Sequence, residues 1–272
     1  MSEAPNGLLV LPRGGRLAPG YRVLGLFTRN RTLDVYEAWS EERECHCMAK
    51  VLRPDHAEDH AARARLVREG RLLLRLTHPH IVRAYELVRE PETTLVLETL
   101  GGETLSHLIR RHRDRRLALP EVMALGTQLA SALAYLHGHG VLHLDVKPAN
   151  VIAEQGRAKL LDLSLVRRPG RGVRGRGTRP YLSPEQARGG AFTAATDVWG
   201  LGSVIYRALA GDTPFPLVEG PGHPQLDGRA PSVRTRRRLP GPVATVVDAC
   251  LEPEPSERPS LAALTTVMDD YL

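Results

Sequence analysis

The spacing of apolar residues changes at Gly101-Gly102, and this change limits the folds that the 272-residue chain can adopt. Before these glycines, short apolar stretches predict strands over 21–27, 34–40, 45–52, 81–88 and 93–98, with one helix over 59–76. After them, apolar residues three to four apart predict helices over 120–138, 197–210 and 260–271. The pattern predicts an α+β chain with a small β-rich lobe, a hinge at 98–102 and a larger, mainly helical lobe.

The composition excludes several classes of protein. Charged residues make up 25% of the chain and apolar residues 42%, which is typical of folded globular domains. No stretch approaches the roughly 20 apolar residues that a membrane span needs. The short apolar run at 8–11 has no basic residue before it, so we do not expect a signal peptide. We therefore expect a cytoplasmic protein with no membrane partner.

The formal net charge of +6 is carried almost entirely by arginine, since the only lysines are Lys50, Lys147 and Lys159. Aromatic residues make up only 4% of the chain, whereas proteins that bind single-stranded nucleic acid use them as stacking platforms. We do not expect a nucleic-acid partner. Arginines gather at 110–116, 167–179 and 229–238. In the second of these segments they either recruit an acidic substrate or form a solvated loop.

Cys45-His46-Cys47 invites comparison with a zinc site, because thiolate and imidazole both suit zinc. No second pair of ligands follows at a suitable spacing, and the apolar alternation around these residues predicts a strand. The chain has three cysteines, which cannot make a disulfide framework. We therefore expect no metal here.

The strongest chemical signal lies at 143–150, where the chain reads His-Leu-Asp-Val-Lys-Pro-Ala-Asn. At this spacing, Asp145, Lys147 and Asn150 bring a base, a cation and a metal ligand to one phosphate. Asp162 follows a short apolar strand and adds a second carboxylate. In the first lobe, Lys50 stands in a predicted strand and Glu69 in the predicted helix.

This set of residues resembles the bacterial Hanks-type serine/threonine protein kinases. Further segments match the family in order: Gly177 to Tyr181, Ser183-Pro184-Glu185, Asp197 to Gly202, Gly211 to Phe215 and Glu257-Arg258-Pro259. The resemblance covers residues 21–272 and implies a bilobal protein kinase fold. It implies an N-terminal tail over 1–20, an N-lobe over 21–100 and a C-lobe over 101–272. It also implies that Arg258 pairs with Glu185.

The resemblance implies phosphoryl transfer from ATP with Mg²⁺, or with Mn²⁺ in its place. Lys50, held by Glu69, would bind the α- and β-phosphates, while Asn150 and Asp162 would hold the metal ions. Asp145 would accept or orient the substrate hydroxyl, and Lys147 would steady the γ-phosphate.

The same resemblance assigns the adenine to the hinge and implies a supporting role for His143 in the catalytic loop. The backbone at Glu98 and Leu100 would contact the base, with Leu97 as gatekeeper. The remaining residues expected around the nucleotide are Thr28, Val35, Met48 and Ile152.

The nucleotide-binding segments depart from the family pattern. Thr28, Asn30 and Leu33 replace the three glycines that let backbone amides approach the phosphates. Met48 stands where a smaller residue is expected and narrows the adenine pocket. Leu163 and Ser164 turn the Asp-Phe-Gly motif into Asp-Leu-Ser.

The activation segment departs from the pattern as well. Leu144 replaces the arginine that in the family reads a phosphorylated activation loop. Residues 165–177 contain no serine, threonine or tyrosine. We therefore predict that the protein is not controlled by phosphorylation of this loop.

Taken with Thr178 in the substrate loop, Lys147 favours serine or threonine over tyrosine as the acceptor. The sequence thus predicts a serine/threonine protein kinase with a protein substrate or regulatory partner. Because the nucleotide loop is the most altered part, the alternative is a pseudokinase scaffold with weak or absent nucleotide binding. A small-molecule phosphotransferase on the same fold is a third interpretation.

Overall fold

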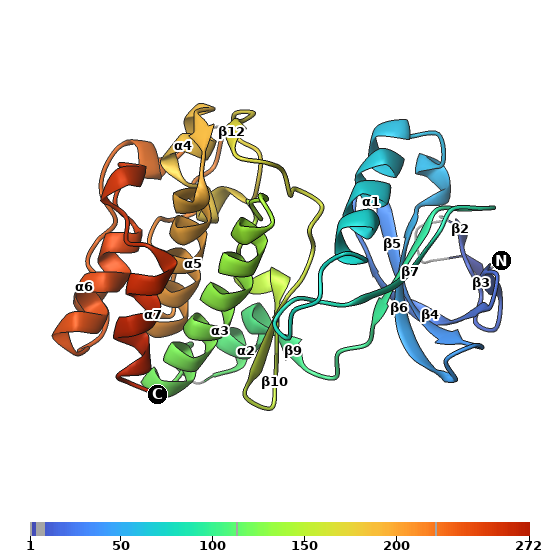
Figure 1. Cartoon of the computed structure of the whole chain (residues 1–272), viewed down its shortest axis with the longest axis horizontal. Helices are drawn as coiled ribbons and strands as arrows, with labels where there is room; N and C mark the ends of the chain where they lie inside the picture. The colour runs from blue at the N-terminus through green and yellow to red at the C-terminus, as the bar shows by residue number, and fades with distance from the viewer. Residues whose placement is uncertain (1, 4–8, 113, 221) are drawn as a thin grey trace. The chain divides into compact units, whose positions relative to one another are not determined.

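The computed structural model describes residues 2–3, 9–112, 114–220 and 222–272 (Figure 1). The chain divides into two compact units. The first unit comprises residues 1–78 and 82–101, and the second comprises residues 79–81 and 102–272. Within the described residues, no helix is both long and apolar enough to cross a membrane.

A six-stranded antiparallel sheet forms the first unit, in the order β3-β4-β5-β6-β8-β7. Because apolar residues alternate along the strands, one face of the sheet packs into a hydrophobic core that includes Tyr36, Ala38 and Cys47. Helix α1 (His60–Leu73) packs on β7 and β8. Asp59 caps its N-terminus, since the Asp59 carboxylate accepts a hydrogen bond from the amide of Ala62. The strands are β3 (Arg16–Ala18), β4 (Tyr21–Arg29), β5 (Leu33–Ser40), β6 (Cys45–Leu52), β7 (Ala84–Val88) and β8 (Thr94–Glu98).

The described residues ahead of Tyr21 belong to the first compact unit. Strands β1 (Ser2–Glu3) and β2 (Leu9–Val10) pair with each other, and β3 lies at the edge of the sheet. Leu17 and Ala18 are buried in the core, and the amide of Leu11 donates to the hydroxyl of Tyr36 at 3.1 Å. The tail over 1–20 was expected because the resemblance to the kinase family begins at Tyr21.

Within the described residues of the second unit, six helices and three of the small strands form the main body (Figure 1). Helix α5 is its centre, since 14 of its 17 residues are buried and it packs against α3 and α6. Helix α7 packs against α3 and α6. The helices are α2 (Leu105–Arg111), α3 (Leu119–Gly138), α4 (Pro184–Arg188), α5 (Ala194–Ala210), α6 (Gly241–Cys250) and α7 (Leu261–Asp269), and the strands are β9 (Glu103–Thr104), β10 (Val151–Glu154) and β11 (Arg157–Leu160).

Two glycines of α5 let other segments approach the helix closely. A Cβ at Gly200 would lie 2.9 Å from Cβ of Val146, and one at Gly202 would lie 2.4 Å from Cβ of Cys250. Val146 stands between two of the predicted catalytic residues. The missing side chain at Gly200 therefore allows the predicted catalytic loop to rest on the central helix.

Most of the predicted elements are confirmed within a few residues. The strand over 45–52 is confirmed at both ends, and it includes the Cys-His-Cys sequence. Cys47 faces the core, whereas His46 contacts the ring of Trp39 edge-on. The described residues include no cluster of three or more His, Cys, Asp or Glu side chains that could hold a metal ion. The expected strand over 81–88 begins only at Ala84, because Ile81 instead bridges Leu160 in the second unit.

Candidate active site

Five of the nucleotide residues predicted in the first unit share one face of its sheet: Thr28, Val35, Met48, Lys50 and Leu97. Across β4, β5 and β6, Thr28 pairs with Val35 and Val35 pairs with Lys50. Met48, two residues before Lys50 in β6, pairs with Leu97 of β8. Side chains opposite each other in a ladder point to the same side, and the core lies on the other side. This face therefore holds an apolar surface around one lysine.

Lys50 forms an ion pair with Glu69 of α1 within the first unit. Its Nζ lies 2.7 Å from Oε1 of Glu69, and the two side chains are 14% and 1% exposed. A charge-assisted hydrogen bond this well shielded holds the lysine in one position. Removing Glu69 would leave the ammonium group without this partner in a largely dry site.

The hinge residues Glu98 and Leu100 follow the end of β8. The Glu98 amide donates to the carbonyl of Arg83 at 3.0 Å, and its carboxylate accepts from the Arg83 amide at 2.8 Å. The Glu98 amide is therefore already used within the first unit. Leu100 is partly buried, and Ile152 lies in β10 of the second unit, paired with Thr104 and Lys159.

The turn that replaces the glycine-rich loop is closed by its own side chain. The side-chain Oδ1 of Asn30 accepts hydrogen bonds from the backbone amides of Thr32 at 3.0 Å and Leu33 at 2.7 Å. The backbone amide of Asn30 donates to the carbonyl of Leu33 at 2.9 Å. This Asx-type turn engages amides that the family pattern assigns to the phosphates. The sequence shows that the glycines are missing, but it does not show this hydrogen bonding, although asparagine is a common turn residue.

The neighbours of this turn hold it further. Nη1 of Arg53 donates to the carbonyls of Asn30 at 3.1 Å and Arg31 at 3.3 Å. Behind the turn, Arg29 makes two hydrogen bonds, at 2.6 and 2.7 Å, to the fully buried carboxylate of Asp34. The hairpin of β4 and β5 is therefore fixed by side chains at a place where glycines would leave it mobile.

In the second unit, Asp145 is the centre of a hydrogen-bond network. Its carboxylate accepts from the hydroxyl of Thr178 at 2.7 Å, from Nζ of Lys147 at 2.6 Å and from Nδ2 of Asn150 at 3.0 Å. Nζ of Lys147 also donates to the hydroxyl of Thr178 at 2.6 Å. The structure thus brings together three residues predicted from their spacing. The direct bond to Thr178 was not predicted, since it joins residues 33 apart in the chain.

His143 supports this loop as predicted. The imidazole is fully buried, and its Nδ1 lies 3.2 Å from the amide of Asp145, which can only donate. Its Nε2 lies 3.0 Å from the carbonyl of Leu161, which can only accept. The ring is therefore the neutral tautomer with the proton on Nε2, and it links the catalytic loop to the segment that precedes Asp162.

Leu144 occupies the left-handed region of the backbone, with φ of 67°. This conformation is costly for a branched residue and needs support from its surroundings. Asp197 of α5 supplies it, since its carboxylate accepts from the amides of His143 and Leu144 at 2.8 and 2.7 Å. The sequence motif at 197–202 was noted, but this role of Asp197 was not predicted.

Asn150 and Asp162 are suited to a magnesium ion that is shared with phosphate. The amide of Leu161 donates to the carbonyl of Asn150 at 2.8 Å, which brings the next residue, Asp162, to the catalytic loop. One carboxylate and one amide oxygen are too few to enclose a cation. Magnesium, however, usually takes one or two protein oxygens and completes its shell with water and substrate phosphate. The donor set therefore fits the metal implied by the resemblance.

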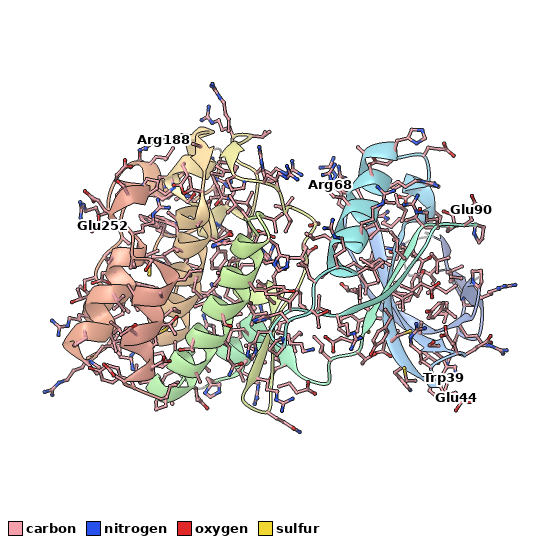
Figure 2. The ribbon with its side chains drawn as sticks, viewed as in Figure 1. Trp39, Glu44, Arg68, Glu90, Arg188 and Glu252 are labelled. Atoms are coloured by element: carbon pink, nitrogen blue, oxygen red, sulfur yellow. The ribbon has the colours of Figure 1, made fainter. Side chains whose placement is uncertain are left out.

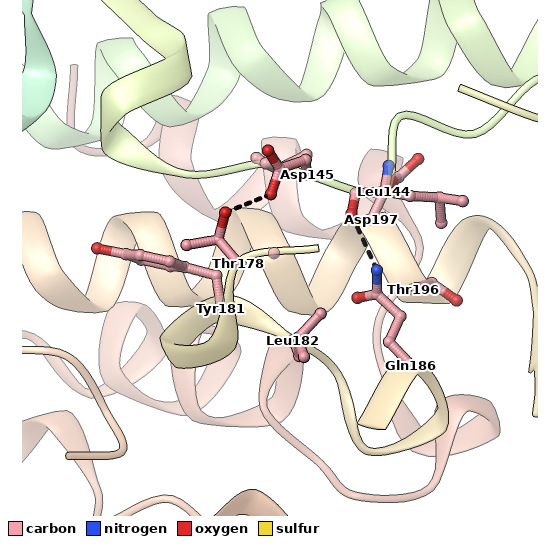
Figure 3. Close-up of a pocket in the computed structure, with 10 residues that line it drawn as sticks. Leu144, Asp145, Thr178, Tyr181, Leu182, Gln186, Thr196 and Asp197 are labelled. Atoms are coloured by element: carbon pink, nitrogen blue, oxygen red, sulfur yellow. Dashed lines mark hydrogen bonds between the residues drawn. The ribbon is translucent and has the colours of Figure 1, made fainter. Parts of the chain in front are cut away.

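A small cavity of about 10 Å³ lies behind the catalytic loop, lined by Leu144, Asp145, Thr178 and Gln186 among others (Figure 3). Nε2 of Gln186 donates to the carbonyl of Leu144 at 2.9 Å across it. Its volume is that of about one water molecule, so it is no nucleotide site.

The predicted pair of Arg258 and Glu185 is confirmed. The guanidinium makes two hydrogen bonds to the carboxylate, at 2.7 and 2.8 Å, with Arg258 0% and Glu185 9% exposed. Burial alone would raise the pKa of Glu185, but the hydrogen bonds and charge of Arg258 outweigh burial and hold it below its usual value. The pair anchors α4 after the activation segment.

The chain is similar to known proteins in sequence and in fold. A model of the protein kinase domain matches residues 32–271. The chain is 37% identical over 233 residues to serine/threonine-protein kinase PkaA of Streptomyces coelicolor, covering 78% of this chain and 40% of that protein. It is 35% identical over 231 residues to serine/threonine-protein kinase PknB of Mycolicibacterium smegmatis, covering 79% and 36%. The chain thus spans well under half the length of these relatives.

Among solved structures, the kinase domain of Mycobacterium tuberculosis PknI superposes with a TM-score of 0.75. The sequences are 25% identical, and the match covers 97% of this chain and 100% of that domain. The chain belongs to the protein kinase family.

Proposed function

We propose that the chain is a serine/threonine protein kinase that transfers the γ-phosphate of ATP to a protein hydroxyl. The network around Asp145 carries the proposal. There, an alcohol, the side chain of Thr178, is already held between a carboxylate and an ammonium group. An incoming serine or threonine hydroxyl has the same chemistry. Serine/threonine kinases are also what the curated relatives are named.

The chemical step follows from these positions. The substrate oxygen forms a bond to the γ-phosphorus, the bond from that phosphorus to its bridging oxygen breaks, and ADP leaves. The hydroxyl proton passes to the carboxylate of Asp145, while Lys147 offsets charge on the transferred group. Lys50, fixed by Glu69, binds the α- and β-phosphates. Asn150 and Asp162 would hold magnesium, which would supply electrostatic stabilisation of the phosphates when bound.

Transfer of labelled γ-phosphate to a generic protein substrate tests this function. The wild-type protein should transfer label with magnesium, and Asp145→Asn should reduce the rate by about 10³-fold or more, because proton acceptance and orientation are lost together. Asp270→Asn, at the exposed end of α7, is a matched control and should keep the rate. Equal rates in wild-type protein and Asp145→Asn would refute kinase activity.

A pseudokinase scaffold is the second candidate, and the closed turn at Asn30 favours it. If the amides of Thr32 and Leu33 stay bonded to Asn30, these two amides cannot bind phosphate. Absence of transfer together with an ATP-dependent rise in melting temperature would indicate a nucleotide-binding scaffold. Absence of both would indicate an interaction module.

A further inference from the structure

We propose that the activation segment forms a cationic surface that selects protein substrates with acidic residues near the acceptor hydroxyl. The inference rests on the proposed kinase function and adds a substrate class to it. The surface consists of Arg168, Arg171 and Arg174 of the segment and Arg188 at the end of α4, and is called here the arginine surface. All four residues are exposed, and Arg188 lies at the outer face of the second unit (Figure 2).

The charge of this segment is one-sided. Residues 163–184 include six arginines and no aspartate or glutamate. Within the described chain, none of the four residues of the arginine surface forms an ion pair with a carboxylate. Exposed arginines elsewhere do have such partners, such as Arg22 with Glu41, Arg111 with Glu103 and Arg229 with Glu252. Exposure alone therefore does not leave an arginine of this chain without a carboxylate partner.

The segment is held in place, which distinguishes the surface from a solvated loop. The amides of Gly172 and Gly175 donate to the carbonyls of Gly190 at 2.9 Å and Gln186 at 2.7 Å. β12 (Gly170–Arg171) pairs with β13 (Ala191–Phe192), where Arg171 lies opposite Ala191. Backbone bonds thus hold several cations on one short segment that has no carboxylate of its own, an arrangement that an anion would stabilise.

Close packing fixes the same segment from beneath. A Cβ at Gly172 would lie 1.9 Å from the ring of Phe192, so the backbone lies directly on that ring. The guanidinium of Arg167 lies 5.7 Å from the centre of the same ring. Between the cations, Val173 is 60% exposed and offers an apolar contact. A short peptide with carboxylates and one apolar side chain complements such a surface.

The position of the surface relative to Asp145 sets the substrate pattern. Arg174 precedes Thr178 by four residues in the same unit, and the hydroxyl of Thr178 lies on Asp145. Four extended residues span at most about 14 Å. A substrate whose hydroxyl takes the place of Thr178 can therefore reach Arg174 with a carboxylate about four residues away along its own chain.

A matched pair of double variants tests the inference. Arg171→Gln with Arg174→Gln removes two charges from the arginine surface, and Arg234→Gln with Arg238→Gln removes two from the exposed cluster near α6. The substrates are two short serine peptides that differ only in having glutamate or glutamine around the acceptor. Wild-type protein should prefer the acidic peptide by about tenfold in kcat/KM at low salt, and less in about 0.5 M NaCl.

Arg171→Gln with Arg174→Gln should remove this preference and keep the rate with the neutral peptide, and the other double variant should change neither. Equal use of both peptides by the wild-type protein would overturn the arginine surface but leave the proposed kinase intact.

If no peptide is phosphorylated, binding of the labelled peptides, measured by fluorescence anisotropy, replaces the rate. Tighter binding of the acidic peptide then supports the surface. Preference for a single-stranded oligonucleotide over that peptide would overturn the inference in favour of nucleic acid.

Discussion

At the scale of single residues, Glu185 and Arg258 show how much one buried contact contributes. The Arg258 side chain is 0% exposed, so Glu185→Gln leaves a buried guanidinium without its counter-charge. We expect this variant to lose about 3–5 kcal/mol of free energy of unfolding near neutral pH, measured by urea denaturation. Glu257→Gln, at an exposed and distant partner of Arg229, should lose less than about 1 kcal/mol.

The same pair predicts a pH dependence. The pKa of Glu185 is lower in the folded protein than its ordinary value of 4.5, so its contribution to stability is complete above about pH 4.5. It is lost as the pH falls through the lowered pKa of the folded state. The difference in unfolding free energy between wild-type protein and Glu185→Gln should therefore shrink on acidification below pH 4.5. A difference that grows there would contradict the assignment.

Asn30 makes a second prediction at this scale, and it rests on the proposed kinase function. Asn30→Gly removes the acceptor from the amides of Thr32 and Leu33, which frees them for phosphate and should lower KM for ATP about five- to tenfold. Asn30→Asp keeps the acceptor but adds a negative charge, so it should raise KM. The opposite order of the two variants would show that Asn30 does not occupy a phosphate position.

Among residues, the sequence predicted those whose role follows from spacing within one segment, such as Asp145, Lys147 and Asn150. It predicted the pairs of Lys50 with Glu69 and of Arg258 with Glu185 only through resemblance, because their partners lie far apart in the chain. Asn30 and Asp197 were missed in their roles. Both act on backbone amides, and a sequence does not show which amides lack a partner.

At the scale of elements, we predict that phosphorylation of the activation segment does not control the proposed activity. Residues 165–177 contain no serine, threonine or tyrosine to accept a phosphate, and the apolar side chain of Leu144 cannot bind one. Backbone hydrogen bonds already fix the segment. Treatment with a broad-specificity protein phosphatase should therefore leave the phosphotransfer rate within about twofold of the untreated protein. Mass spectrometry confirms removal of any phosphate. A large loss of activity on treatment would contradict this prediction.

Elements with a strong period were predicted closely, and short ones were missed. Strand β6 alternates over its whole length, and α3 carries an apolar residue at nearly every third or fourth position. Helices α2 and α4 have seven and five residues, too few to display a helical period. Helix α6 begins at Gly241-Pro242, which the composition alone marks as a turn.

At the scale of the whole molecule, two cysteines report on the two units separately. Burial raises the pKa of Cys47, in the first core, to about 11 and that of Cys250, in the second, to about 12. At about pH 8 only about one thiol in 10³ or fewer is ionised at either site, so both should resist iodoacetamide, whereas partly exposed Cys45 reacts.

Pulsed labelling along a urea gradient then follows each unit by mass spectrometry. Cys47 should become reactive at a lower urea concentration than Cys250, because the first unit is smaller and a smaller unit buries a smaller fraction of its surface. Cys250 reacting first would show that the second unit is the less stable. The division into a β-rich and a helical part was predictable from the change in period, whereas the inclusion of residues 9–18 in the first unit was not.

The activation segment held by its own backbone has a consequence for signalling. A phosphorylated loop keeps a record of an earlier event until a phosphatase erases it. Residues 165–177, bonded through Gly172 and Gly175 and packed on Phe192, contain no hydroxyl side chain that could be phosphorylated. On the proposed kinase function, we therefore expect no record of this kind to persist in the activation segment from one encounter to the next.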